Sequence, residues 1–216
     1  MFTIVCNSQK GGSGKSALSR VLAVQASRLG KSVYLIDTDT QGTLTQWHEA
    51  REAEEPRRVE LTREALPNGL KALAAQGADF VFIDTPPNAS EHLDDVFLLA
   101  DIVLVPIKPT PDDLKAALVT VTRVKVLDIP FLFVITQAIQ NTNITAQAIA
   151  ALSYHGIVAK TILVNRVSYP SAFTDGRAPQ EIEPKGPAAR EIGTLWDNIQ
   201  EYLHTSNSKT RKVANG

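Results

Sequence analysis

Short apolar runs, rich in β-branched residues, recur along this chain and alternate with segments that have helical spacing. The runs are residues 2–6, 32–36, 80–83, 102–105, 131–135 and 161–164. Each is as long as a strand and apolar at nearly every position, which predicts strands buried on both faces. The spacing of apolar residues within 18–29 and 114–127 predicts helices between them. The alternation therefore predicts a doubly wound α/β fold, with a mostly parallel β-sheet flanked by helices.

The length of the chain, 216 residues, fits one domain of this kind. Two segments interrupt the alternation. The mixed charges of residues 49–64 are typical of a solvated face, and the four prolines of residues 169–187 predict a structured or functional loop. A last helix is expected at 188–203. We therefore expect a single domain over residues 1–203, followed by a flexible basic tail at 204–216.

The charge and cysteine content exclude several classes of protein. A formal charge of −1, from 22 basic and 23 acidic residues, shows no global basic excess, so any nucleic-acid site must be a local patch. One cysteine, Cys6, cannot form an intramolecular disulfide or a cysteine-ligated cluster, and we expect it to pack within the first strand. No apolar run is long enough to span a membrane, and the first residues lack the features of a secretory signal. These features predict a cytoplasmic protein.

A glycine-rich segment, Gln-Lys-Gly-Gly-Ser-Gly-Lys-Ser at residues 9–16, directly follows the first predicted strand and opens a predicted helix. Glycines let the backbone curl so that its N–H groups face an anion, and the helix N-terminus adds partial positive charge. Lys15 can then reach the β- and γ-phosphates of a nucleotide, and Ser16 can hold Mg²⁺. The segment departs from an ordinary phosphate loop at its first position, where Gln9 replaces glycine, and it contains a second lysine, Lys10.

Carboxylates follow two further predicted strands. Asp37 and Asp39 end one, and Asp84 ends another. Ligands of open α/β sheets bind at the carboxyl ends of the strands, and Mg²⁺ takes few protein carboxylates because it keeps several waters. Taken alone, each has a plainer interpretation: Asp37 and Thr38 can cap the following helix, and an apolar strand ending in Asp is common in α/β proteins. Beside the glycine-rich segment, the three acids predict a nucleotide–magnesium site.

The motif Lys-Gly-Gly-x-Gly-Lys-Ser is the deviant Walker A motif, and with the acids above it makes the chain resemble the ParA/MinD family of P-loop ATPases. The likeness extends over nearly the whole chain, through Asp-Thr-Asp-Thr-Gln at 37–41, Asp-Thr-Pro-Pro-Asn at 84–88 and the turn at 106–113. It is greatest for the small ParF-like plasmid partition ATPases, because the motif begins within the first dozen residues. Thr40 stands where the family has proline, which predicts a less rigid switch loop.

The resemblance implies a role for each candidate residue. ATP and Mg²⁺ are the implied cofactors, with Lys10, Lys15 and Asp39 catalytic and Asp39 orienting the attacking water. Lys10 is implied to reach the phosphates of a partner subunit's ATP, and residues 84–88 to form a switch that senses the γ-phosphate. The metal is assigned to Ser16, Asp37 and Asp84. The nucleotide is assigned to Lys10, Gly11, Gly12, Ser13, Gly14, Lys15, Ser16 and Ala17, with Pro179 and Glu181 near the base.

The resemblance also implies an ATP-dependent switch for plasmid or chromosome partitioning. An ATP-bound homodimer binds DNA without sequence preference, becomes nucleoid-associated, and is released when a centromere-binding partner stimulates its weak ATPase activity. The folded part has no basic run, so the candidate DNA contacts are scattered along the sequence. Scattered surface lysines more often make a protein soluble than bind a ligand. They are Lys160, Arg166, Lys185 and Arg190, with the tail residues Lys209, Arg211 and Lys212 as accessories.

Other functions share these motifs. A ParA-like positioner of a chemoreceptor array, a carboxysome or a conjugation complex would show all of them. A MinD-like membrane ATPase would need a basic amphipathic helix at the C-terminus, whereas residues 205–212 are polar throughout, so no membrane contact is expected. A metabolic P-loop enzyme would need a substrate pocket with further polar residues, and a nitrogenase-type redox ATPase would need cluster cysteines. The cargo and the partner protein stay open.

Overall fold

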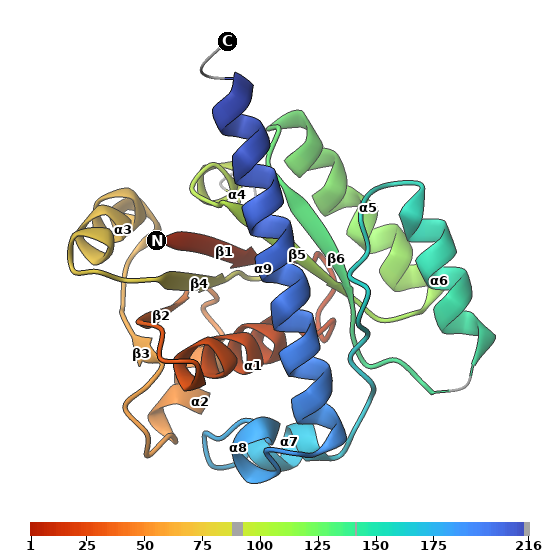
Figure 1. Cartoon of the computed structure of the whole chain (residues 1–216), viewed down its shortest axis with the longest axis horizontal. Coiled ribbons are helices and arrows are strands. Elements are labelled where there is room, and N and C mark those ends of the chain that lie inside the picture. Colours follow the sequence, from red (N-terminus) through yellow and green to blue (C-terminus); the bar gives the residue numbers. More distant parts are fainter. Residues whose placement is uncertain (88–92, 141, 214–216) are drawn as a thin grey trace.

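Six strands form one sheet in the part of the chain that the structure describes, which is residues 1–87, 93–140 and 142–213, with only the backbone at 206–213. In this computed structural model the order is β3-β2-β4-β1-β5-β6, and all neighbouring strands are parallel (Figure 1). The strands are β1 (Phe2–Cys6), β2 (Val33–Asp37), β3 (Arg57–Arg58), β4 (Phe80–Asp84), β5 (Ile102–Ile107) and β6 (Phe131–Ile135). The predicted doubly wound α/β fold is confirmed.

Helices cover both faces of the sheet (Figure 1). They are α1 (Lys15–Arg28), α2 (Thr43–Glu49), α3 (Leu66–Ala75), α4 (Leu93–Phe97), α5 (Pro111–Val126), α6 (Asn143–Ser153), α7 (Ser168–Phe173), α8 (Pro179–Ile182) and α9 (Pro187–Val213), with a 3-10 turn at Arg63–Ala65. Strand residues alternate between two apolar clusters: Ile4 and Cys6 pack with α1, α2 and α9, whereas Val5 packs with α3, α4 and α5. Cys6 is fully buried, as predicted, and burial raises the pKa of its thiol to about 12.

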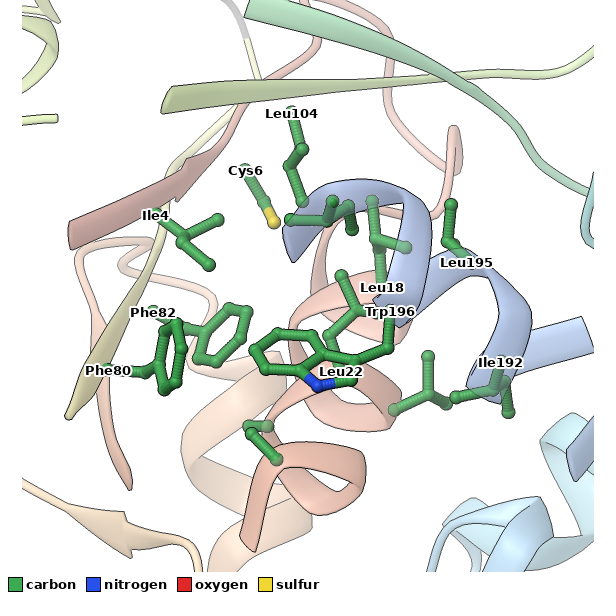
Figure 2. Close-up of a cluster of buried hydrophobic side chains, with 14 of the residues drawn as sticks. Ile4, Cys6, Leu18, Leu22, Phe80, Phe82, Leu104, Ile192, Leu195 and Trp196 are labelled. Atoms are coloured by element: carbon green, nitrogen blue, oxygen red, sulfur yellow. The ribbon is translucent and has the colours of Figure 1, made fainter. Parts of the chain in front are cut away.

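Trp196 of α9 anchors the first of these layers. Its indole ring lies 4.9 Å from the Phe80 ring and 6.3 Å from the Phe82 ring, measured between centroids, and the same cluster contains Leu18 and Leu22 of α1 (Figure 2). α9 crosses the sheet on the same side as α1 (Figure 1). The aromatic contacts therefore fix α1, and with it the glycine-rich loop at its N-terminus, against the sheet.

The edges of the sheet differ from the prediction. Residues 161–164 do not form a strand: Val164 makes an isolated bridge to Ala138, and the segment lies beside the end of β6 without a continuous ladder. The charged segment 49–64 is mostly exposed or half-buried, as expected of a solvated face, and it also contributes β3, which pairs with Tyr34 and Leu35 of β2. The strand prediction at 161–164 was therefore wrong, because the backbone pairing is confined to Leu163 and Val164 and is too short to form a ladder.

The C-terminal third is more helical than expected. The proline-rich segment 169–187 contains α7 and α8, and Pro179 occupies the first turn of α8, where a missing N–H costs nothing. The last helix, expected to end at Leu203, continues to Val213. Among the described residues, no helix combines the length and apolar character needed to cross a bilayer.

Trp196→Ala is expected to lower the free energy of unfolding by about 3 to 5 kcal/mol, because it leaves a cavity between α9 and β4. For a domain of this size the melting temperature should fall by roughly 6 to 20 °C. Thermal and urea unfolding measure the loss. Val126→Ala is the control: that side chain is 80% exposed, so its change should stay within about 0.5 kcal/mol. Equal stability of the two variants would contradict this account of the core.

Candidate functional site

The glycine-rich loop at residues 9–14 joins the carboxyl end of β1 to α1. Gly12 and Gly14 have φ angles of +73° and +100°, a region that residues with a side chain rarely adopt. Gly14 is the N-cap of α1 and provides no side chain to cap it. The loop thus has the curled backbone and the uncapped helix N-terminus that suit an anion.

Two residues that follow β6 hold this loop in shape. The Thr136 hydroxyl donates a hydrogen bond to the Ser13 carbonyl at 2.7 Å, and the Gln137 amide donates to the Gly12 carbonyl at 3.0 Å. Gln137 itself has a φ angle of +51°. Sequence reasoning missed both residues, because nothing in their local sequence marks them as contacts of a loop more than a hundred residues earlier.

The acids at the strand ends lie together, as predicted. Asp37 and Asp84 are direct register partners on β2 and β4, and Cys6 of β1 flanks Asp84 on the other side. The Asp84 side chain is buried, with 1% exposure, and its oxygens have no hydrogen-bond partner of acceptable geometry among the described residues. Burial raises the Asp84 pKa to about 7, and the Asp37 charge adds to this effect.

Three nearby groups partly offset that rise. The Ser16 hydroxyl lies close enough to favour the ionised form of Asp84, and the charges of Lys15 and Arg20 also lower its pKa. Lys15 is 6% exposed, and its own pKa is lowered by burial in spite of the charges of Asp84 and Asp39. A buried lysine beside a buried carboxylate is therefore present at the start of α1.

A magnesium ion fits this group of residues. Asp84 is a buried carboxylate without a hydrogen bond, beside Ser16 and Asp37, and a bound cation would satisfy it. No cluster of three His, Cys, Asp or Glu side chains able to hold a metal occurs in the described residues. A metal here would thus take further ligands from water and phosphate, which is the preference of Mg²⁺.

Asp37 also stabilises the start of α2, which is the simpler role that its sequence position allowed. Its carboxylate accepts hydrogen bonds from the Thr45 backbone N–H at 2.9 Å and the Thr45 hydroxyl at 3.1 Å, in the first turn of α2. It also accepts from the Asp39 N–H at 3.0 Å. The Asp39 carboxylate accepts from the Gln41 N–H at 3.0 Å and is half-buried. The 37–41 segment is thus held by its own carboxylates.

Lys10 is engaged within its own chain. Its ammonium lies 2.6 Å from a carboxylate oxygen of Asp113 on α5, and this hydrogen bond raises the Lys10 pKa. The same oxygen accepts from the Thr110 hydroxyl at 2.5 Å, while the Thr110 hydroxyl caps α5 by accepting from the Asp113 N–H. Lys10 keeps 41% of its side chain exposed, so it can exchange this partner for another.

A largely apolar cavity of about 310 Å³ opens beside Gly14 and Ala17. Its wall comprises Thr136, Gln137, residues 163–166 and the α7 residues Tyr169, Pro170 and Phe173. Pro179 and Glu181, expected near the base, do not line it; Glu181 instead forms a bidentate ion pair with Arg51, at 2.6 and 2.8 Å. The cavity's position next to the loop makes residues 163–173 the candidate base-binding wall.

Arg20 connects this cavity to α2. Its guanidinium lies 4.8 Å from the Phe173 ring centroid and 5.7 Å from that of Trp47, and it donates to the Thr43 carbonyl at the start of α2. Burial lowers its pKa to about 10. Sequence reasoning missed Arg20. The only signal was a charged residue on the buried face of α1, one turn after Ser16.

Of the four DNA-contact candidates, Lys160 lies apart from the other three along α9. Lys160 pairs with Glu201 at 3.2 Å, and Arg166 pairs with Glu191 at 2.5 Å and lines the cavity. Arg190 donates to the carbonyl of Lys185, so these two lie together. Glu201 lies roughly 16 Å along α9 from Arg190. Asn88, predicted in the second switch, and the side chains of the basic tail lie outside the described residues.

Comparison with known proteins agrees with this geometry. The sequence model of the CobQ/CobB/MinD/ParA nucleotide binding domain matches residues 4–204. The chain is 26% identical over 208 residues to "Maintenance of carboxysome distribution protein A" of Halothiobacillus neapolitanus, covering 92% of this chain and 96% of that protein. It is 28% identical over 188 residues to "Protein ParA" of Rhizobium radiobacter, covering 82% and 84%. The structure of MinD with Mg-ADP from Pyrococcus horikoshii superposes with a TM-score of 0.77 at 14% identity, covering 95% and 98%.

The buried Asp84 predicts a pH-dependent stability in the absence of nucleotide and Mg²⁺. The folded chain keeps a proton on Asp84 up to about pH 7, whereas an unfolded chain loses it near pH 3.8, so the folded state binds more protons between these values. The free energy of unfolding should therefore fall by about 2 to 3 kcal/mol from pH 5 to pH 7.5, relative to Asp84→Asn. Urea unfolding at both pH values measures this. Parallel pH profiles of the two proteins would show that Asp84 is already ionised at pH 5.

Proposed function

Because this chain belongs to the CobQ/CobB/MinD/ParA nucleotide-binding family of P-loop ATPases, we propose that it is a ParA-type ATPase that positions a cargo by ATP-dependent dimerisation and DNA binding. One observation carries the proposal: a glycine-rich loop with two lysines lies beside Asp84, a buried carboxylate without a hydrogen-bond partner. This pairing of an anion site with a cation site suits Mg-ATP. The family match supports the same ligand, since ATP with Mg²⁺ is its general cofactor.

In the proposed reaction ATP and water give ADP and phosphate. The loop and Lys15 bind the phosphates, and the Leu163–Phe173 wall holds the base. Ser16 and Asp84, with Asp37 nearby, would hold Mg²⁺, which neutralises phosphate charge. Asp39 orients the attacking water. Its half-buried position on a loop fixed by Asp37 supports this role.

Lys10 couples the nucleotide to association. In the single chain its charge is satisfied by Asp113. In the proposed ATP dimer it exchanges Asp113 for the phosphates of the partner subunit's nucleotide, which is a charge supplied in trans. Loss of the γ-phosphate weakens that contact and returns Lys10 to Asp113. The nucleotide thereby shifts the equilibrium between monomer and dimer.

The proposed cargo is a plasmid or chromosome, moved with a centromere-binding partner that stimulates hydrolysis. Likeness to a carboxysome distribution protein over 96% of that protein favours a second candidate, in which the cargo is a carboxysome. In both proposals this chain acts as an ATP dimer on non-specific DNA. Copurification with a cargo-bound partner protein separates them.

The DNA surface is proposed to include Lys185 and Arg190, exposed neighbours at the start of α9. Dimerisation would double this basic surface, which would allow a near-neutral chain to bind DNA. Lys160 and Arg166 belong to the same proposal, although each has an acidic partner in the single chain. The basic residues of the tail would add to this surface.

ATP, but not ADP, should convert the protein from monomer to dimer and allow it to retain random-sequence duplex DNA. Light scattering with each nucleotide gives the mass, and gel shifts at increasing salt give the affinity, which should fall steeply with salt. Lys10→Ala should keep nucleotide binding as a monomer while weakening the dimer. An ATP-bound protein that stays monomeric and ignores DNA at low salt would contradict the proposal.

Asp39→Ala should leave ATP binding and dimerisation intact and reduce turnover by two orders of magnitude or more, because the attacking water loses its orienting carboxylate. Phosphate release under single-turnover conditions measures the rate, and equilibrium titration measures ATP affinity. Lys15→Ala is the contrasting variant and should abolish binding. Wild-type turnover in Asp39→Ala would remove Asp39 from the mechanism.

A further inference from the structure

A third lysine reaches the glycine-rich loop from a distant part of the chain. Lys108 follows β5, and its ammonium lies 3.7 Å from the position that a Cβ atom would take at Gly12. Gly12 has no side chain and is exposed, so the ammonium lies over the backbone of the loop. No motif marks Lys108, since it lies more than ninety residues beyond the loop.

The three lysines around the loop differ in their partners. Lys10 is paired with Asp113, and Lys15 is buried near Asp84. Lys108 is half-buried, and its ammonium has no ion pair or hydrogen bond with any residue that the structure describes. A cation held beside an uncapped helix N-terminus lacks a favourable electrostatic partner until an anion arrives.

The backbone around Lys108 is constrained. Pro109 follows it, which restricts Lys108 to extended conformations, and Pro106 precedes it within β5. The Lys108 carbonyl accepts a hydrogen bond from the Thr110 N–H at 2.7 Å. The backbone that carries the lysine is thus constrained before any ligand binds, which lowers part of the entropic cost of a contact.

We propose that Lys108 is a phosphate-binding residue that contacts the di- or triphosphate of the nucleotide held by its own chain. This inference rests on the proposed function and deepens it. Lys108 acts in cis, because it lies against the loop of its own chain, whereas Lys10 is assigned to the partner's nucleotide. Lys108 therefore contributes to ADP binding as well as ATP binding, before any dimer forms.

Lys108→Met is expected to weaken ADP binding to the monomer roughly 10- to 100-fold, the loss typical of a charge-assisted hydrogen bond. Lys108→Arg should recover most of the affinity. Calorimetric titration of ADP at several salt concentrations should also give a shallower salt dependence for Lys108→Met, because one charged contact is missing. A purely structural role would leave that salt dependence unchanged.

Lys31→Met is the matched control. Lys31 is exposed and precedes β2, so in a parallel sheet it lies at the edge opposite the loop, and its variant should bind ADP like wild type. Wild-type ADP affinity in Lys108→Met, with only the ATP dimer weakened, would place Lys108 on the partner's nucleotide and overturn the inference. A wild-type protein that binds neither nucleotide would overturn the proposed function and this inference with it.

Discussion

The parallel alignment of the strands is the constraint on which the site depends. Because β2, β4 and β1 run in the same direction and in register, Asp37, Asp84 and the start of the glycine-rich loop meet at one edge. The same alignment places two carboxylates side by side and buries one of them, which is unfavourable without cations nearby. Lys15 and Arg20 on α1 supply that charge. Because Trp196 packs in the same apolar cluster as α1, this packing also holds the two cations of α1 beside the buried carboxylate.

Sequence patterns were sufficient to predict the structure wherever a few neighbouring residues determine it. A strand such as β4, buried on both faces, must be apolar throughout, and its polar end then identifies Asp84. The loop at 9–14 needs glycine where φ is positive, so its composition reveals its conformation. In both cases a few adjacent residues carry the whole physical requirement. This is why the fold, and the placement of the loop beside the strand-end acids, could be predicted.

Features that depend on distant partners could not be read in this way. β3 has only two residues, and its pairing with β2 is what makes it a strand. Glu181 appeared available for a ligand, yet Arg51, far away in the sequence, binds it with two hydrogen bonds. Arg20 gains its role from two rings contributed by α2 and α7. Each interaction joins segments that are far apart in the sequence and come together only in the folded chain, so no local sequence pattern predicts it.

The distribution of charge around the loop favours the proposed ligand. Lys10 and Asp113 satisfy one another, whereas among the described residues the Lys108 ammonium has no ion pair or hydrogen bond and the Asp84 carboxylate accepts no hydrogen bond. An anion alone would pair with the lysine but leave the buried carboxylate without a ligand. A cation alone would bind the carboxylate but leave the lysine unpaired. A metal–polyphosphate complex brings both charges in one ligand. Its binding would satisfy both groups at once, and the proposed preference for a metal–polyphosphate over free phosphate rests on this joint requirement.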